Sequence, residues 1–283
     1  MKLIKSSFEI LPQASGLEGI YKQIELAGRN CYKSEDKICD GSAIKMVENL
    51  VKRGHGTPLE HGTVYLYIPF DAMKEKWLLI NRYKDNPYSK VVIRNESFLL
   101  GKNGYYITTN YRVLVENKWL EDLKYICEPT EYHEKRVSVM ITCAIAISRE
   151  FNRHRTFSIC EQSTRYCNYS LGKFDSNITF IIPTWSENIT FPVDYSKLTI
   201  SEKTLLRIFS DAEIAYMELI NQQKKPQEAR EALPLATATT VMYTGFVSDW
   251  KHFFELRTAI GAHPDARAIA TALQNEFNNR GYI

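Results

Sequence analysis

The spacing of hydrophobic residues predicts a series of amphipathic helices. Apolar side chains recur at helical spacing over residues 17–34 and again over 42–52, and Asp40-Gly41 forms a break between the two segments. A longer stripe of the same period covers residues 201–222. Proline in the first turn and a polar cap residue are typical of helix starts. We therefore predict three more helices: a short one opened by Pro226 and stopped by Pro234, one over residues 248–260 with Ser248 or Asp249 as its cap, and one that begins at Pro264.

Runs of β-branched and aromatic residues alternate with these helices and predict strands. After the strand-like run over residues 135–147, Ser148 is suited to cap a short helix that reaches Arg155. Residues 81–117 contain Asn-Pro and Gly-Lys-Asn-Gly turns and a strand-like segment over 105–116, which favours a hairpin-bearing insertion. We expect a single α/β domain of the α+β kind over residues 1–283, with a central mixed or antiparallel sheet flanked by helices. The predicted strands cover residues 64–70, 135–147, 177–184 and 236–246.

The overall composition excludes only a few classes of protein. A chain of 283 residues with 44% hydrophobic content can bury a normal core. The formal net charge is +3, from 36 basic and 33 acidic side chains, which is too even for a protein that coats nucleic acid. The 6 cysteines include no Cys-x-x-Cys pair and the chain start lacks a long apolar core, so we expect reduced thiols in the cytoplasm. No apolar run approaches the roughly 18 residues that suggest a membrane helix, so we expect no membrane partner.

The densest group of chemistry-bearing residues lies between Arg153 and Arg165. An Arg-His-Arg triplet opens it at residues 153–155, and Glu161, Ser163 and Arg165 follow. Guanidiniums this close repel one another unless an anion lies among them, and their planar forks of donors match phosphate oxygens. Glu161 is an acceptor among donors, suited to hold a ribose hydroxyl or to orient an arginine. The sequence therefore predicts a phosphorylated ligand.

The same cluster carries a family signature. Arg153-His154-Arg155, seven intervening residues and then Ser163 resemble the signature of the flavin-dependent thymidylate synthases. Three other segments resemble elements of that family in the same order along the chain: the His-Gly-Thr-Pro-Leu-Glu-His turn at residues 55–61, Arg-Glu-Ala-Leu-Pro at 230–234, and the segment from Trp250 to Arg257. The matching segments are spread over nearly the whole chain, so the resemblance concerns the protein as a whole.

The resemblance implies the fold of that family and a methyltransferase reaction. The family converts dUMP to dTMP by reductive methylation, with carbon from 5,10-methylenetetrahydrofolate and hydride from NADPH or NADH passed through FAD. It uses no cysteine nucleophile, although Cys160 and Cys167 flank the signature here. Its members are homotetramers whose active sites are shared between subunits. We therefore expect dUMP and folate as small-molecule partners, FAD as cofactor and a homotetramer.

The resemblance also implies roles for single residues. Arg257 corresponds to the arginine that contacts the uracil ring and favours its N3-deprotonated form, and it is our candidate catalytic residue. His61 is expected beside the flavin and the folate. The remaining positions divide between dUMP (Glu150, Phe151, Asn152, Arg153, Glu161, Gln162, Ser163, Thr164, Arg165, Arg230 and again Arg257) and FAD (Thr63, Arg153, His154, Arg155, Glu161, Phe246, Val247, Ser248 and His252).

Three single positions depart from the family pattern. Glu150 stands where the family often has Gln, and a bare carboxylate would repel the phosphate, so direct contact with it is not expected. His252 and Cys160 stand where some or many members have Asn. We therefore expect a rearranged set of hydrogen bonds to the flavin.

Two other classes of function stay open from the sequence. A nucleic-acid-binding module would use the Arg-His-Arg cluster on backbone phosphates and stack bases on Tyr166, Tyr169 and Phe174. A metal-dependent hydrolase would use His55, Glu60 and His61. We expect no metal, because no His-Glu-x-x-His segment or cysteine pair completes a set of ligands.

Overall fold

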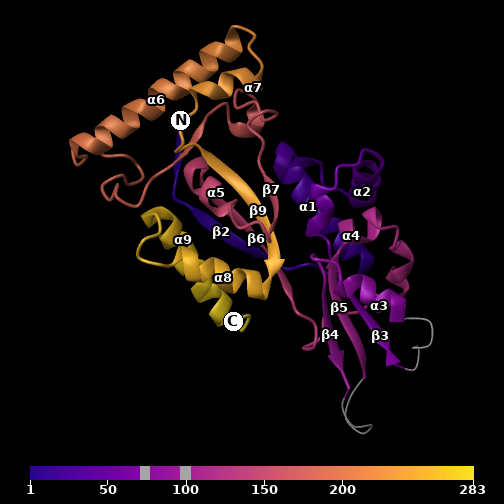
Figure 1. Cartoon of the computed structure of the whole chain (residues 1–283). Coiled ribbons are helices and arrows are strands. Elements are labelled where there is room, and N and C mark those ends of the chain that lie inside the picture. The colour runs from indigo at the N-terminus through magenta and orange to yellow at the C-terminus, as the bar shows by residue number, and fades with distance from the viewer. Residues whose placement is uncertain (71–76, 96–102) are drawn as a thin grey trace.

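The described residues, 1–70, 77–95 and 103–283 of a computed structural model, contain three β-sheets (Figure 1). The central sheet is antiparallel and four-stranded, a second sheet is antiparallel and three-stranded, and a third is one parallel pair. This mixture of antiparallel sheets and helices confirms the predicted fold class. In sheet order the strands are β2 (Ser7–Leu11), β6 (Arg136–Ala144), β9 (Ala238–Phe246) and β7 (Ser158–Glu161); β3 (Thr63–Pro69), β5 (Gly104–Asn110) and β4 (Lys90–Arg94); and β1 (Lys2–Ile4) and β8 (Thr179–Ile181).

The helices agree closely with the hydrophobic periodicity. The predicted helix over 42–52 has the bounds of α2, and Pro264 begins the last helix. None of the described helices is long and apolar enough to span a membrane. The helices are α1 (Gly16–Tyr32), α2 (Ser42–Lys52), α3 (Trp77–Lys84), α4 (Tyr111–Glu116), α5 (Ile145–Phe151), α6 (Ile200–Asn221), α7 (Pro226–Ala229), α8 (Val247–Arg257) and α9 (Pro264–Asn279), with 3-10 turns η1 (Glu35–Lys37), η2 (Thr57–His61), η4 (Leu120–Tyr125), η5 (Gly172–Phe174) and η6 (Arg230–Ala232).

Two helix starts differ from the sequence prediction. Helix α5 runs from Ile145 to Phe151, so Ser148 lies inside the helix and is not its cap, and the predicted extension to Arg155 is wrong. The Ser148 hydroxyl instead donates to the Ile145 carbonyl and to Glu161. Helix α8 begins one residue before Ser248, and the Asp249 carboxylate accepts the N–H of Phe246 from within the first turn. In both places a polar side chain acts from inside the helix, which spacing alone does not distinguish from a cap.

The insertion around 81–117 forms the predicted hairpin, because β4 pairs antiparallel with β5. The segment between them includes residues 96–102, which lie outside the described residues. The strand-like segment over 105–116 is strand only as far as Asn110, whose side chain accepts the N–H of Val113 and caps helix α4. Strand β5 also pairs with β3, so the hairpin belongs to a three-stranded sheet. We call residues 63–126, from β3 to η4, the accessory region.

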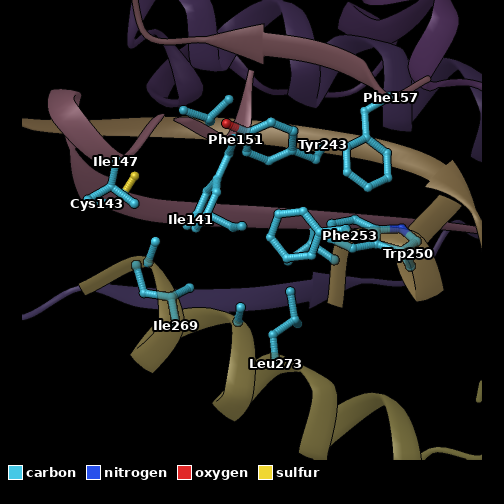
Figure 2. Close-up of a cluster of buried hydrophobic side chains, with 14 of the residues drawn as sticks. Ile141, Cys143, Ile147, Phe151, Phe157, Tyr243, Trp250, Phe253, Ile269 and Leu273 are labelled. Carbon is cyan, nitrogen blue, oxygen red and sulfur yellow. The ribbon is translucent and has the colours of Figure 1, made fainter. Parts of the chain in front are cut away.

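The central sheet positions the site because both of its faces are covered. On one face, alternate residues of β6 and β9 pack against α5, α8 and α9, and Figure 2 shows Phe151, Tyr243 and Trp250 in this cluster. On the other face, Cys160 and Met242 pack against Ala27 of α1. The alternation follows from the period of two in a strand.

Helix α1 joins the central sheet to the accessory region. Ile20 and Ile24 belong to the accessory core with α2 and β3, whereas Ala27, one turn later, faces the central sheet. The parallel pair lies at the other end of the molecule, under α6 and α7 (Figure 1). The edge strand β7 is therefore enclosed between α1 and β9, and the residues that follow it emerge beside the end of α1.

Candidate active site

The candidate catalytic residue, Arg257, is held in one orientation at the end of α8. Its Nε donates to His154 Nε2 at 2.9 Å, and its two terminal nitrogens donate to the Glu150 carbonyl at 2.7 Å and to Glu150 Oε2 at 3.3 Å. The Arg257 side chain keeps 15% exposure. A guanidinium fixed by three acceptors and still open on one side can present its positive charge to a bound molecule.

His154 accepts the hydrogen bond from Arg257 only when it is neutral. Burial, followed by the charges of Arg257 and His252, lowers the pKa of His154 to about 4. With Nε2 as acceptor, the ring proton lies on Nδ1. At neutral pH the Arg257–His154 contact therefore carries one positive charge.

Glu161 is the centre of a second set of contacts, at the end of β7. Its two carboxylate oxygens accept the Ser148 hydroxyl at 2.7 Å and the Asn152 amide at 3.0 Å. The Asn152 oxygen accepts the Tyr243 hydroxyl at 2.8 Å. Burial raises the pKa of Tyr243, so this hydroxyl stays protonated and donates. The network fixes both the amide of Asn152 and the carboxylate of Glu161.

The segment after β7 is anchored through its backbone. The N–H of Gln162 donates to Thr240, and the N–H of Ser163 donates to the carbonyl of Cys31 at 3.0 Å. The Thr164 hydroxyl accepts Arg230 at 3.3 Å, which brings the turn η6 to this segment. The side chains of Arg165 and Arg230 are exposed there. One hydroxyl and one guanidinium from distant parts of the chain, those of Thr164 and Arg230, therefore meet beside this segment.

Two of the predicted FAD residues, Arg155 and Phe246, line an open cavity of about 570 Å³. Ser158 and Arg136 line it as well, and Arg136 donates to the Thr63 hydroxyl at 3.3 Å. Burial lowers the pKa of Arg136 only to about 10, so the guanidinium is charged at neutral pH. An aromatic ring, hydroxyls and guanidiniums around one cavity fit a flavin dinucleotide, whose two phosphates are anionic.

His61 is fully buried at the base of this region. Its Nδ1 contacts the Thr244 hydroxyl at 2.8 Å, and its Nε2 is buried without a hydrogen-bond partner. Burial and the charge of Arg136 lower the pKa of His61 to about 3. The ring is neutral, and in this conformation it does not reach the molecular surface.

Several predicted residues do not converge with these clusters in the single chain. Phe151 is fully buried in the central core (Figure 2), so only its backbone is available to a ligand. The Ser248 hydroxyl donates to Glu134, and Val247 N–H donates to Lys135. Two more predicted contacts, Arg153 and His252, are exposed. The ring centres of His252 and His154 are 6.1 Å apart.

Sequence analysis missed Arg136, Tyr243 and several cavity residues. Arg136 donates to the Glu60 carbonyl at 3.0 Å and to the Ser158 hydroxyl at 3.0 Å, besides Thr63. A lone arginine at a strand start gives no spacing signal. Tyr243 sits among the apolar residues of β9, where a tyrosine is expected in the core. The other missed residues of the cavity are Thr57, Glu60, Pro87, Tyr88, Lys90, Asn110, Thr156, Phe157, Ser158, Ile159 and Asp249.

The cysteines beside the signature are not poised for nucleophilic attack. Cys160 and Cys167 are 2% and 0% exposed. A hydrogen bond with Cys31 and burial raise the pKa of Cys160, and burial raises that of Cys167. Because the thiolate is the reactive form, neither thiol is activated.

The geometry of the two alternative sites differs from what those functions need. Glu60 is paired with Arg112, and His61 is buried against Thr244, so they do not form a set of ligands. Across the described ranges no three His, Cys, Asp or Glu side chains are grouped to hold a metal ion. Tyr169 is 3% exposed and packs on Phe174 with ring centres 4.9 Å apart, so it offers no free face for a base.

Comparison with known proteins identifies the family of the chain. The family model described as thymidylate synthase complementing protein matches residues 130–280. A flavin-dependent thymidylate synthase of Aquifex aeolicus is 22% identical over 94% of this chain and 96% of its own length. The flavin-dependent thymidylate synthase of Pyrococcus furiosus is 28% identical over 50% of this chain and 53% of its own length.

A solved structure resembles the chain only distantly. The UMP/dUMP methylase PolB from Streptomyces cacaoi, bound with 5-Br dUMP, shares 17% identity and a TM-score of 0.45, covering 99% of this chain and 93% of PolB. That TM-score is too low to bear on fold or function. The family match, which covers more than half of the residues and contains the Arg257, Glu161 and Arg230 clusters, is the decisive comparison. The chain therefore belongs to the thymidylate synthase complementing family, that of the flavin-dependent thymidylate synthases.

Proposed function

We propose that the protein methylates C5 of dUMP to give dTMP, with 5,10-methylenetetrahydrofolate as carbon donor and NADPH or NADH as reductant through FAD. The methylene unit of the folate replaces the hydrogen on C5 and is reduced to a methyl group. Because the nicotinamide supplies both electrons, the folate leaves as tetrahydrofolate. Family membership supports this reaction class, and the relatives from Aquifex aeolicus and Pyrococcus furiosus carry the name flavin-dependent thymidylate synthase.

The fixed orientation of Arg257 is the observation that carries the proposal. Attack by C5 of the uracil ring on a methylene carbon is easier when the ring bears negative charge. A guanidinium held by His154 and the Glu150 carbonyl stabilises that charge without having to reorganise during the reaction. Arg257 would thus favour the N3-deprotonated ring, and His154 would keep it aimed.

Glu150 would bind Arg257, which avoids the expected repulsion between its carboxylate and the phosphate of dUMP. Its carboxylate lies 3.3 Å from a terminal nitrogen of Arg257, so its charge is balanced by that guanidinium. Glu150 would orient the arginine through both its carboxylate and its carbonyl. It would therefore act on the uracil through Arg257, without direct contact with the phosphate.

The phosphate and sugar of dUMP would lie beside the segment after β7. Arg165 and Arg230 carry exposed guanidiniums, and Ser163 and Thr164 add hydroxyls to the same place. Arginine forks suit a phosphate dianion. Glu161, whose oxygens already accept Ser148 and Asn152, has remaining acceptor capacity for a ribose hydroxyl.

FAD would be held in the cavity by Arg155, Phe246 and the Arg136–Thr63 pair. When bound, FAD relays the two electrons from the nicotinamide to the methylene unit. The chain's own contribution is to bind and orient the cofactor and to place its cations near the phosphates. Neither Cys160 nor Cys167 takes part, since both are buried with raised pKa values.

We further propose a homotetramer whose active sites are shared between subunits. Arg153, Arg165, Arg230 and His252 are predicted ligand contacts that lie exposed on the isolated chain. Exposed contacts of this kind are completed when a second subunit closes over the ligand. Sedimentation of the FAD-loaded protein would give the mass of four chains.

Exchanging Arg257 for alanine tests the proposed role of this residue. We expect dTMP formation in an anaerobic assay with dUMP, methylenetetrahydrofolate, NADPH and FAD to fall by about 100-fold or more. Flavin affinity, measured separately, should stay within about twofold of the wild type, because Arg257 lies outside the FAD cavity lining. The matched control is Arg280→Ala, which removes an arginine paired with Glu276 on α9. Normal dTMP formation by Arg257→Ala would show that the assigned role is wrong.

A further inference from the structure

We infer that Lys90, from the accessory region, binds a phosphate oxygen of FAD. The inference rests on the proposed function and adds a cofactor contact from a part of the chain that the family match does not include. Lys90 begins strand β4, and its side chain lines the same 570 Å³ cavity as Arg155 and Phe246. The accessory sheet thus supplies one wall of the cofactor site.

The cavity is built from two halves of the chain. Residues within the family match form one wall, at the starts of β6, β7 and α8. The other lining residues come from η2 and the accessory region, where Pro87, Tyr88, Lys90 and Asn110 lie. Tyr88 is 59% exposed. A ligand that fills the cavity therefore contacts both halves of the chain.

The charges in the cavity favour an anion. Lys90, Arg136 and Arg155 line it, against the carboxylates of Glu60 and Asp249. Glu60 pairs with Arg112 at 2.5 Å, and Arg112 also pairs with Glu116 at 2.7 Å. The Asp249 carboxylate accepts the Phe246 N–H at 3.0 Å and caps α8. Among the residues that line the cavity, three cations therefore face two acids.

Lys90 and Arg136 share one aromatic ring. The Lys90 ammonium lies 5.4 Å and the Arg136 guanidinium carbon 5.6 Å from the centre of the Phe246 ring. Two cations beside one ring repel each other, and an anion that contacts both relieves the repulsion. Arg136 is fixed by its three hydrogen bonds, so the flexible lysine is the one that can adjust to the ligand.

The charge of Lys90 is only loosely compensated. Among the described residues, the Lys90 ammonium pairs with one carboxylate oxygen of Glu134 at 3.8 Å, and the other oxygen of that carboxylate accepts the Ser248 hydroxyl. The Lys90 side chain is 45% exposed. A loose, half-exposed ion pair contributes little to stability. The ammonium is therefore free to bind a phosphate at small cost to the fold.

Titration of the flavin-free protein with FAD, followed by quenching of flavin fluorescence, tests the inference. We expect Lys90→Ala to raise the dissociation constant for FAD by about tenfold, since one charge-assisted hydrogen bond is lost. Lys90→Glu should raise it further, because a negative charge then faces the phosphate. Lys90→Arg should stay near the wild type. The matched control is Lys84→Ala, an exposed lysine of α3 that does not line the cavity.

Salt dependence and turnover separate binding from folding and from catalysis. The loss of affinity in Lys90→Ala should shrink between 50 mM and 500 mM NaCl, because screening weakens a partly exposed charge contact. Its dTMP turnover should recover at saturating FAD, and its thermal midpoint should match that of Lys84→Ala. FAD affinity equal to that of the wild type in Lys90→Ala, or no FAD binding by the wild type, would overturn the inference. Wild-type protein that binds FAD through Lys90 but forms no dTMP would refute the proposed function alone.

Discussion

The central sheet and the accessory region both bury charged side chains, but they use them differently. In the accessory region, the Asp122 carboxylate accepts the Tyr83 hydroxyl at 2.6 Å and pairs with Arg82, which lies 4.5 Å from the Trp119 ring. These partners all belong to the same region. Beside the central sheet, Arg257 and Glu161 are also hydrogen-bonded, yet each keeps capacity for another group.

The difference indicates which buried charges serve folding and which serve a ligand. The accessory network joins secondary elements, as Asp122 joins η4 to α3, and its two unpaired atoms, Asp122 Oδ1 and Arg82 Nε, are buried. The network at the site holds Arg257 in place and leaves its side chain 15% exposed. Neither burial nor an unpaired atom therefore identifies a functional group; a fixed charge that stays accessible to a ligand does.

Removing Asp122 gives the largest expected effect on stability. Asp122→Ala leaves Arg82 without its carboxylate, so we expect a loss of about 4 kcal/mol in the free energy of unfolding by urea. Asp85→Ala, which removes an exposed acid of the same region, should change stability by less than about 0.5 kcal/mol. The remaining folded Asp122→Ala protein should keep its turnover per molecule. A variant that stayed stable but lost turnover would break the distinction between the two regions.

The buried His61 between the two regions predicts the response to acid. Its pKa is lowered to about 3 in the fold and returns to the model-peptide value of about 6.5 on unfolding, so the unfolded chain binds the extra proton. Stability should therefore be complete above pH 6.5 and fall by roughly 3 kcal/mol as the pH drops to 4. His61→Gln should show a flatter profile in urea unfolding series over that range. An unchanged slope in this variant would mean that other groups dominate the acid response.

Exchanging Cys160 and Cys167 together for alanine gives the smallest expected effect. Both thiols are buried beside the site and neither is activated. Turnover per folded molecule should stay within about threefold of the wild type, since the substitution removes packing but no chemical group of the reaction. Complete loss of dTMP formation with an intact fold, judged by circular dichroism, would return a cysteine nucleophile to consideration.

Local patterns predicted much of the fold. Helix α2 has its predicted bounds because a regular apolar stripe is flanked by a glycine and by a break in the stripe. Only the hairpin of the accessory sheet could be predicted from the sequence. Strand β3 pairs with β5 over a long stretch of chain, as in the pair Thr63 and Asn110, and local spacing carries no information on such a partner. The start of α5 was misplaced for a similar reason: the apolar run of β6 continues into the helix without a change in composition.

The candidate site was predictable where a motif carries it. Arg153 to Arg165 and Arg257 were found because their spacing resembles a family signature, and the structure brings Glu161, Asn152, His154 and Arg257 into two neighbouring networks. Arg136 and Lys90 are single cations in strands. Their importance depends on which elements meet at the cavity, which only the tertiary structure shows.

The central claim is that this chain replaces the hydrogen on C5 of dUMP by a methyl group with electrons from a nicotinamide. The most direct measurement is tritium release from dUMP labelled at C5, followed with dTMP formation in an anaerobic mixture of FAD, methylenetetrahydrofolate and NADPH. We predict one tritium released to water for each dTMP formed, and neither product when FAD or the folate is omitted. FAD-loaded protein that releases no tritium and forms no dTMP in the complete mixture would contradict the account.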